Sequence, residues 1–144
     1  MIQIRRQAIV RRTPETMFDL VNDVEAYPTR FAWCAGARVL ARDGDTALTA
    51  QLDLRFAGLT QSFTTRNTLD RPSRLRLHLV DGPMRALEGE WTFAPLGEDG
   101  CRVALTLDFD FSGRLAGMAL RLGFQGLANR MVDDFCAAAS QSDG

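Results

Sequence analysis

The side chains that could carry catalysis are few in this sequence and lie far apart. His78, the one histidine, alternates with arginines on the polar side of an expected strand, where no partner base is evident. Asp108 and Asp110 stand two residues apart and therefore share one face of an expected strand, as a general acid–base pair could. That face is the polar one, so the sequence favours two solvated carboxylates.

Cysteine chemistry is equally limited. Cys34, Cys101 and Cys136 are odd in number, widely spaced and without a CxxC motif. This pattern predicts free thiols in a reducing compartment, with neither a disulfide framework nor a metal site. Cys34 is a conceivable nucleophile, but no histidine is near it in the sequence. The GxSxG, phosphate-loop and Rossmann signatures are also absent, so a binding protein is favoured over an enzyme.

The basic residues are all arginines, 17 in number against 18 acidic residues, and the net charge of −1 gives no general basic field for DNA. Arg5-Arg6 and Arg11-Arg12 nevertheless form a local basic cluster on the first expected strand. Two interpretations stay open: a solvated strand edge, or a contact to the RNA phosphates of a ribosome. Arg66 is likewise either solvated or a polar contact to a ligand carbonyl or a partner.

The hydrophobic period changes along the chain, and the changes define the elements that hold these residues. Residues 2–11 alternate as a strand, and Thr13-Pro14-Glu15 begins the first of two short helices. Residues 36–111 have a period of two, interrupted by turn residues, which predicts six more strands. From about Gly113 to Ala138 the period is helical, with one apolar stripe formed by Leu120, Phe124, Leu127, Met131 and Phe135.

This order of elements predicts an α+β helix-grip fold. A curved antiparallel sheet of about seven strands would wrap around a long C-terminal helix, with two short helices after the first strand, in a single domain over residues 1–144. The N-terminus lacks the apolar stretch of a secretory signal, and no apolar run is long enough to span a membrane. The expected location is the cytoplasm, with peripheral contact to the inner membrane as a further expectation.

Four segments follow one another over nearly the whole chain: Leu20–Val24 with Tyr27-Pro28 and Trp33-Cys34; Phe63–Asn67; Leu79–Pro83 with Leu87, Trp91 and Phe93; and Leu107–Phe111 with Met131 and Phe135. In these segments the sequence resembles the START-like, polyketide-cyclase superfamily, and within it the coenzyme Q-binding and RatA-type ribosome-association subgroup. The sequence departs from the usual family pattern at three positions. An aromatic residue is usual at the positions of Arg30 and Met84, and a proline is usual at the position of Ala32. These departures fall in segments expected at the rim of a cavity.

The resemblance implies a ligand cavity between the sheet and the long helix. Alternation alone does not distinguish a cavity wall from a filled core, since both are apolar. Tyr27, Phe31 and Trp33 are expected at a rim beside a ligand head group, and the loop before Met84 is either a plain turn or a gate. The expected ligand-binding residues are Tyr27, Phe31, Trp33, Phe56, Phe63, Leu79, Met84, Trp91, Phe93, Phe109, Phe111, Met118 and Leu122.

The function that the resemblance implies is non-catalytic binding, transport or chaperoning of a hydrophobic molecule. Ubiquinone or a related isoprenoid lipid is the sharpest version, in support of respiratory electron transport. The first alternative is a RatA-type toxin that binds the large ribosomal subunit and blocks subunit association, and the second is a polyketide cyclase or aromatase. No metal and no cofactor are expected, apart from a quinone or lipid as bound ligand.

Overall fold

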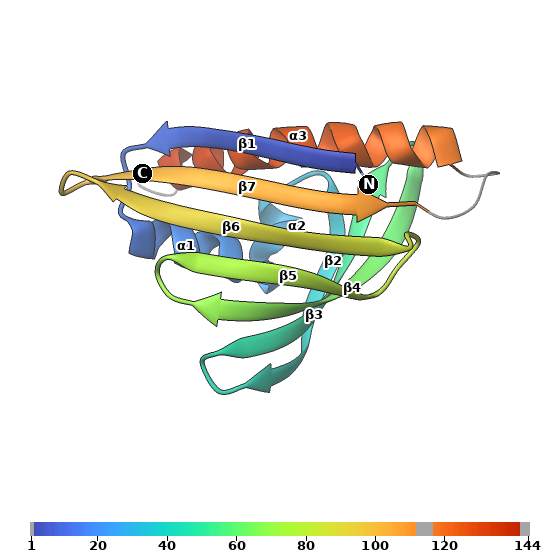
Figure 1. The fold of residues 1–144 in the computed structure, drawn as a ribbon, viewed down its shortest axis with the longest axis horizontal. Coiled ribbons are helices and arrows are strands. Elements are labelled where there is room, and N and C mark those ends of the chain that lie inside the picture. Colours follow the sequence, from blue (N-terminus) through green and yellow to red (C-terminus); the bar gives the residue numbers. More distant parts are fainter. Residues whose placement is uncertain (1, 112–116, 142–144) are drawn as a thin grey trace.

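The alternating apolar residues form one antiparallel sheet of seven strands, as the sequence predicted (Figure 1). The computed structural model describes residues 2–111 and 117–141. In space the strands follow the order β1-β7-β6-β5-β4-β3-β2, so the first strand pairs with the last and the others form a meander. Their bounds are β1 (Ile2–Val10), β2 (Cys34–Asp43), β3 (Ala47–Phe56), β4 (Leu59–Asp70), β5 (Arg74–Asp81), β6 (Ala86–Leu96) and β7 (Gly100–Asp110).

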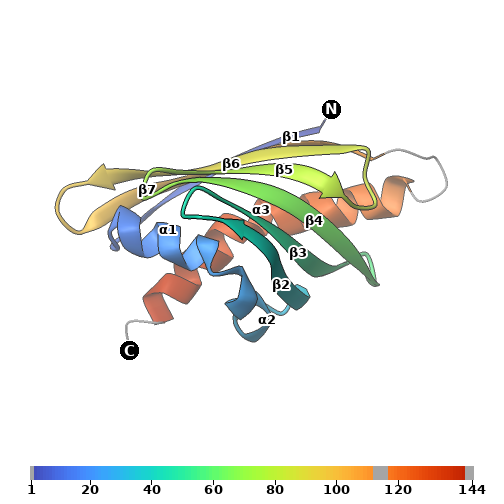
Figure 2. The same ribbon diagram turned by 90° about the horizontal axis from the view of Figure 1, so that it is seen from below.

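The helices lie together on the concave side of the sheet, and α3 crosses beneath it (Figure 2). They are α1 (Pro14–Asn22), the 3-10 turn η1 (Val24–Ala26), α2 (Tyr27–Arg30) and α3 (Gly117–Gln141). The predicted start of the long helix, near Gly113, lies outside the described residues, and α3 continues past its predicted end near Ala138. None of the described helices is long and apolar enough to cross a bilayer. This arrangement confirms the helix-grip prediction.

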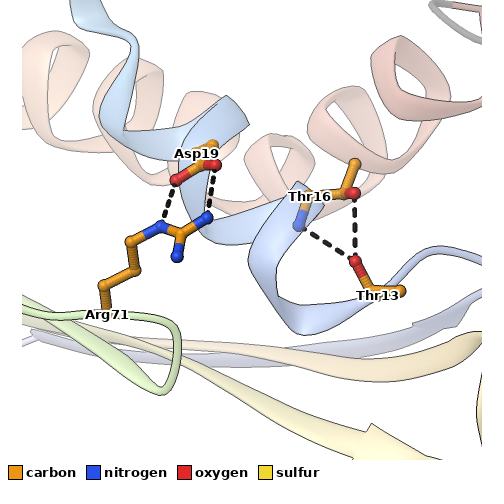
Figure 3. Close-up of polar contacts among 4 residues, drawn as sticks. All are labelled: Thr13, Thr16, Asp19 and Arg71. Atoms are coloured by element: carbon orange, nitrogen blue, oxygen red, sulfur yellow. Dashed lines mark hydrogen bonds and ion pairs between the residues drawn. The ribbon is translucent and has the colours of Figure 1, made fainter.

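Local sequence fixes the position of α1 over the sheet (Figure 3). The side chain of Thr13 caps the helix, because its hydroxyl oxygen accepts a hydrogen bond from the Thr16 amide at 3.2 Å, and Pro14 occupies the first turn. On the outer side of the helix, the two carboxylate oxygens of Asp19 accept hydrogen bonds from Arg71, each at 2.8 Å. Arg71 belongs to the turn between β4 and β5, so this ion pair joins α1 to that turn of the sheet.

The sheet bends strongly where β2, β3 and β4 curve toward the helices (Figures 1 and 2). Register shifts that act as β-bulges occur twice in β2, at Cys34/Gly36 and Val39/Ala41, and once in β5, where Val80 has no partner in β4. A bulge bends its strand and increases the local twist. At Gly36 a Cβ atom would lie 2.8 Å from a carboxylate oxygen of Asp53, so a larger residue at this bend would require the Asp53 side chain to move.

The apolar stripe of α3 packs against the concave face. Its buried residues recur at helical spacing and include Leu120, Phe124, Leu127, Val132 and Phe135, each at most 8% exposed. Near the start of the helix, Gly123 approaches the β3–β4 turn so closely that a Cβ atom would lie 3.0 Å from both the backbone nitrogen and the Cβ of Ala57. The helix therefore closes the open side of the sheet and encloses the interior between them.

Candidate ligand-binding cavity

A cavity of about 70 Å³ lies in the interior between the sheet and α3. Side chains from β3 to β7 form one wall, and residues of α1, η1, α2 and α3 form the other. Gly89 of β6 stands opposite Leu77 on one neighbouring strand and Leu107 on the other. A Cβ atom at Gly89 would lie 2.4 Å from the Cδ2 of Leu107, so the glycine provides the space that these two lining leucines occupy.

Four of the predicted ligand-binding residues line this cavity. They are Tyr27 of α2, Trp33 of the turn before β2, Phe63 of β4 and Trp91 of β6. The other lining residues are Val21, Val24, Ala50, Leu52, Leu54, Thr65, Asn67, Leu75, Leu77, Leu87, Leu105, Leu107, Phe124, Met131 and Phe135. The predicted set therefore contains aromatic residues of this wall but none of its seven leucines.

Seven predicted residues pack around the cavity without lining it. Phe56, Phe109 and Phe111 surround Phe124 with ring centroids 5.6, 4.8 and 5.9 Å away, so they fill one end of the interior. Phe93 stacks beside Trp91 at 6.3 Å and is 2% exposed. The remaining three are Phe31 and Met84, which are buried, and Leu79, which is half-buried. These residues form ordinary close-packed core.

Met118 and Leu122 do not face the interior. They are 65% and 58% exposed, on the outer face of α3. The reason is helical phase: each stands two residues before a buried residue, Leu120 or Phe124, and two residues turn a helix by about 200°. Their apolar character suggested an inward position. However, the inward face of α3 is the one that carries Leu120 and Phe124, and Met118 and Leu122 do not share it.

The expected rim residues form a closed wall. Phe31 and Trp33 stack at 4.7 Å, and Tyr27 and Phe31 both lie against Phe135, at 5.3 and 4.6 Å. The Tyr27 hydroxyl donates a hydrogen bond to the carbonyl of Val21, and burial raises the pKa of this phenol. The indole N–H of Trp33 donates to a carboxylate oxygen of Asp134 at 2.9 Å. The polar atoms of both side chains are therefore already bonded within the protein.

A buried polar pair on β4 completes the wall and was not among the predicted site residues. Thr65 and Asn67 are 7% and 3% exposed and both line the cavity. The Thr65 hydroxyl donates a hydrogen bond to the Oδ1 of Asn67 at 2.8 Å. Their alternation with Phe63 and Leu69 indicates an inward position, and this was the available signal in the sequence.

The residues first considered for catalysis lie away from the cavity. The side chain of His78 is 67% exposed, and its Nδ1 lies 3.1 Å from a carboxylate oxygen of Glu88 on the convex face of the sheet. The three cysteines are free, as predicted. Burial raises the pKa of the Cys34 and Cys136 thiols and that of Cys101 to about 11. These thiols are therefore protonated near neutral pH and poor nucleophiles.

Comparison with known families agrees with this geometry. Residues 10–136 match the family described as polyketide cyclase / dehydrase and lipid transport. The chain belongs to this family. The family includes proteins of several functions, so membership establishes the fold and leaves the ligand and the activity open.

Two curated relatives and one solved structure show the range of that family. The ribosome association toxin RatA of Escherichia coli K12 is 40% identical over 98% of this chain and 89% of its own length. The mitochondrial coenzyme Q-binding protein coq10 of Schizosaccharomyces pombe is 26% identical over 94% of this chain and 85% of its own length. The Zhui aromatase/cyclase of a Streptomyces species has the same fold, with a TM-score of 0.88, 16% identity and coverage of 99% and 96% of the two chains.

Proposed function

We propose that this chain is a non-catalytic protein that associates with the large ribosomal subunit. The observation that carries the proposal is the 40% identity to a ribosome association toxin over nearly the full chain, compared with 26% for the coenzyme Q-binding relative. This reverses the order expected from the sequence, in which ubiquinone binding came first. Ribosome association would place the protein in the cytoplasm.

The convex surface near the end of β1 offers a contact for ribosomal RNA. Arg11 and Arg102 are exposed there, beside Ile9, which is 69% exposed and lies opposite Arg102 in the β1–β7 ladder. Within the described part of the chain, neither arginine makes an ion pair, so both guanidinium groups can bind phosphate. Arg5 and Arg6 lie 3.8 and 3.6 Å from Asp108 and Asp133, which makes them weaker candidates than the sequence suggested.

Co-sedimentation with purified large and small subunits over a range of salt tests this proposal. Wild-type protein should sediment with the large subunit, with an affinity that falls steeply as salt rises. Arg11→Glu/Arg102→Glu should reduce the affinity at least tenfold and flatten the salt dependence. The matched control is Arg42→Glu/Arg85→Glu, which reverses two exposed arginines elsewhere on the surface. Equal loss in both variants would exclude this patch, and absence of wild-type binding would exclude ribosome association.

A second function, binding of a small apolar molecule in the cavity, is favoured by the cavity itself. Its volume of about 70 Å³ corresponds to about five water molecules, at roughly 10–15 Å³ of this measure for each. One ring fits such a space, whereas an isoprenoid tail does not fit unless the interior widens. We therefore propose a ring-sized apolar ligand, with the ring of a quinone as one candidate.

Mass spectrometry of organic extracts from the purified protein tests whether such a ligand is carried. In a second assay, a ring-sized ligand at a hundredfold excess over its Kd should stabilise the protein by about 2.7 kcal/mol. For a chain of this size, that corresponds to a rise in Tm of roughly 5–10 °C. A long-tailed ubiquinone should give a smaller rise than its tailless ring. An empty extract together with no shift for any ring-sized compound would rule out this second function.

A further inference from the structure

Most polar side chains that line the cavity already donate their protons to other groups of the protein. Tyr27 donates its hydroxyl proton to the Val21 carbonyl, and Trp33 donates its indole proton to Asp134. Thr65 donates its hydroxyl proton to the amide oxygen of Asn67. Each of these three groups has therefore used its proton inside the protein. Among the described residues that line the cavity, the one remaining side-chain donor is the amide nitrogen of Asn67.

Asn67 is 97% buried, since 3% of its surface is exposed. Among residues 2–111 and 117–141, its Nδ2 atom has no hydrogen-bond partner. On both sides its neighbours in the sheet are leucines, Leu48 of β3 and Leu77 of β5. An unpaired donor in an apolar environment destabilises a protein, and a leucine of similar size would avoid that cost at this position. An unpaired amide at the wall of an apolar cavity is thus the feature expected of a ligand contact.

Thr65 determines which atom of the amide is available. Because its hydroxyl proton is donated to Oδ1 at 2.8 Å, the oxygen of Asn67 is occupied and the two N–H bonds of Nδ2 are left for another partner. The partner must therefore present an acceptor. No charged side chain is among the described residues that line the cavity, so a charged ligand would lose its hydration without gaining a counterion.

We propose that the Nδ2 of Asn67 donates a hydrogen bond to the acceptor oxygen of a neutral, ring-sized ligand in the cavity, with a ring ketone or quinone carbonyl as the chemical class. Thr65 is the positioning residue that orients the amide. This inference rests on the second proposed function, the binding of a small apolar molecule. It goes beyond it by naming the polar group that the ligand must carry and the residue that recognises it.

The test uses two probes of the same shape. Acetophenone has a carbonyl oxygen, and α-methylstyrene has a CH2 group in its place. Binding is measured by calorimetry on the full chain, and the side-chain amide signal of Asn67 is followed by NMR. Wild-type protein should bind acetophenone roughly three- to tenfold more tightly than α-methylstyrene, the range expected for one hydrogen bond. Acetophenone should shift the Asn67 signal much more than α-methylstyrene does, and benzoate should not bind.

Two variants separate recognition from folding. Asn67→Leu should keep its affinity for α-methylstyrene and lose the preference for acetophenone. Thr65→Val keeps the shape of the wall but removes the hydrogen bond that orients the Asn67 amide. It should therefore reduce the preference for acetophenone over α-methylstyrene. If Asn67→Leu fails to fold, Thr65→Val provides the test in its place. If wild-type protein binds both probes equally and the Asn67 signal does not respond to the carbonyl, this inference is wrong while the cavity function stands. If neither probe binds, the cavity function itself fails and the inference with it.

Discussion

Polar groups are exposed to water on the convex face of the sheet and enclosed by apolar residues on the concave face. On the convex face, charged residues form exposed pairs such as Arg76 with Glu90 and His78 with Glu88. Water can replace either partner there, so each pair contributes little to stability. On the concave face, Thr65 and Asn67 share one hydrogen bond in an apolar environment. A single substitution should therefore have a large effect on the concave side and a small one on the convex side.

The largest effect should come from Phe135, the residue of α3 that joins the aromatic wall to the sheet. It is 1% exposed and contacts Tyr27, Phe31 and Trp91 with ring centroids 4.6–5.3 Å apart. Phe135→Ala should lower the free energy of unfolding by about 3–5 kcal/mol, measured by urea denaturation. Leu122→Ala, on the exposed face of the same helix, should change it by no more than about 0.5 kcal/mol. Similar losses in both variants would contradict the assigned orientation of α3.

An intermediate effect is expected at two glycines of α3. Gly123→Ala places a methyl group 3.0 Å from the backbone of Ala57, which should cost about 1–3 kcal/mol through overpacking. Gly126 has no atom within 4 Å of its Cβ position, so Gly126→Ala should instead stabilise the helix by about 1 kcal/mol. Thermal unfolding of the two variants measures the difference. Stabilisation by both would show that the helix can move away from the sheet freely.

The smallest effect belongs to the exposed pair of Asp19 and Arg71. The hydrogen bonds from Arg71 lower the pKa of Asp19 below its ordinary value. Because the pKa is lower in the folded state, the pair stabilises the protein above about pH 4 and loses this contribution as pH falls through the folded value. Asp19→Asn should lower Tm by no more than a few degrees at pH 6, and the difference from wild type should shrink toward pH 3. A difference from wild type that stays the same down to pH 3 would contradict this assignment.

The fold could be predicted from the sequence because its signals are periodic. The change from period two to helical spacing marked the strands and α3, and the Thr13-Pro14 cap marked the start of α1. The cavity could be predicted only in part. Alternation indicates which face of the sheet a residue occupies, but it does not indicate whether that residue packs against another side chain or lines an open space. Phe109 and Leu107 share one face of β7, and yet the first packs against Phe124 while the second lines the cavity.

Two misjudged groups show what chemistry adds to periodicity. Met118 and Leu122 were placed inward on the strength of their apolar character, although their phase on the helix contradicted it. Asn67 was in phase with the interior, but an asparagine gave no reason to expect a ligand contact until its neighbours and its hydrogen bond to Thr65 were known. For both, the position in the repeat was more informative than the residue type.

The pairing of β1 with β7 also has a consequence for how the chain folds during synthesis. Ile2 pairs with Phe109 and Val10 with Cys101, so the partner of the first strand is made about 100 residues later. At roughly 5–20 residues per second, β1 would wait about 5–20 seconds for that partner. Its four exposed, charged or polar side chains (Gln3, Arg5, Arg6 and Gln7) would keep the unpaired strand from adding to the edge of another chain. Closure of the sheet should thus be a late event, and removing those charges should increase aggregation of the nascent chain more than it alters the finished protein.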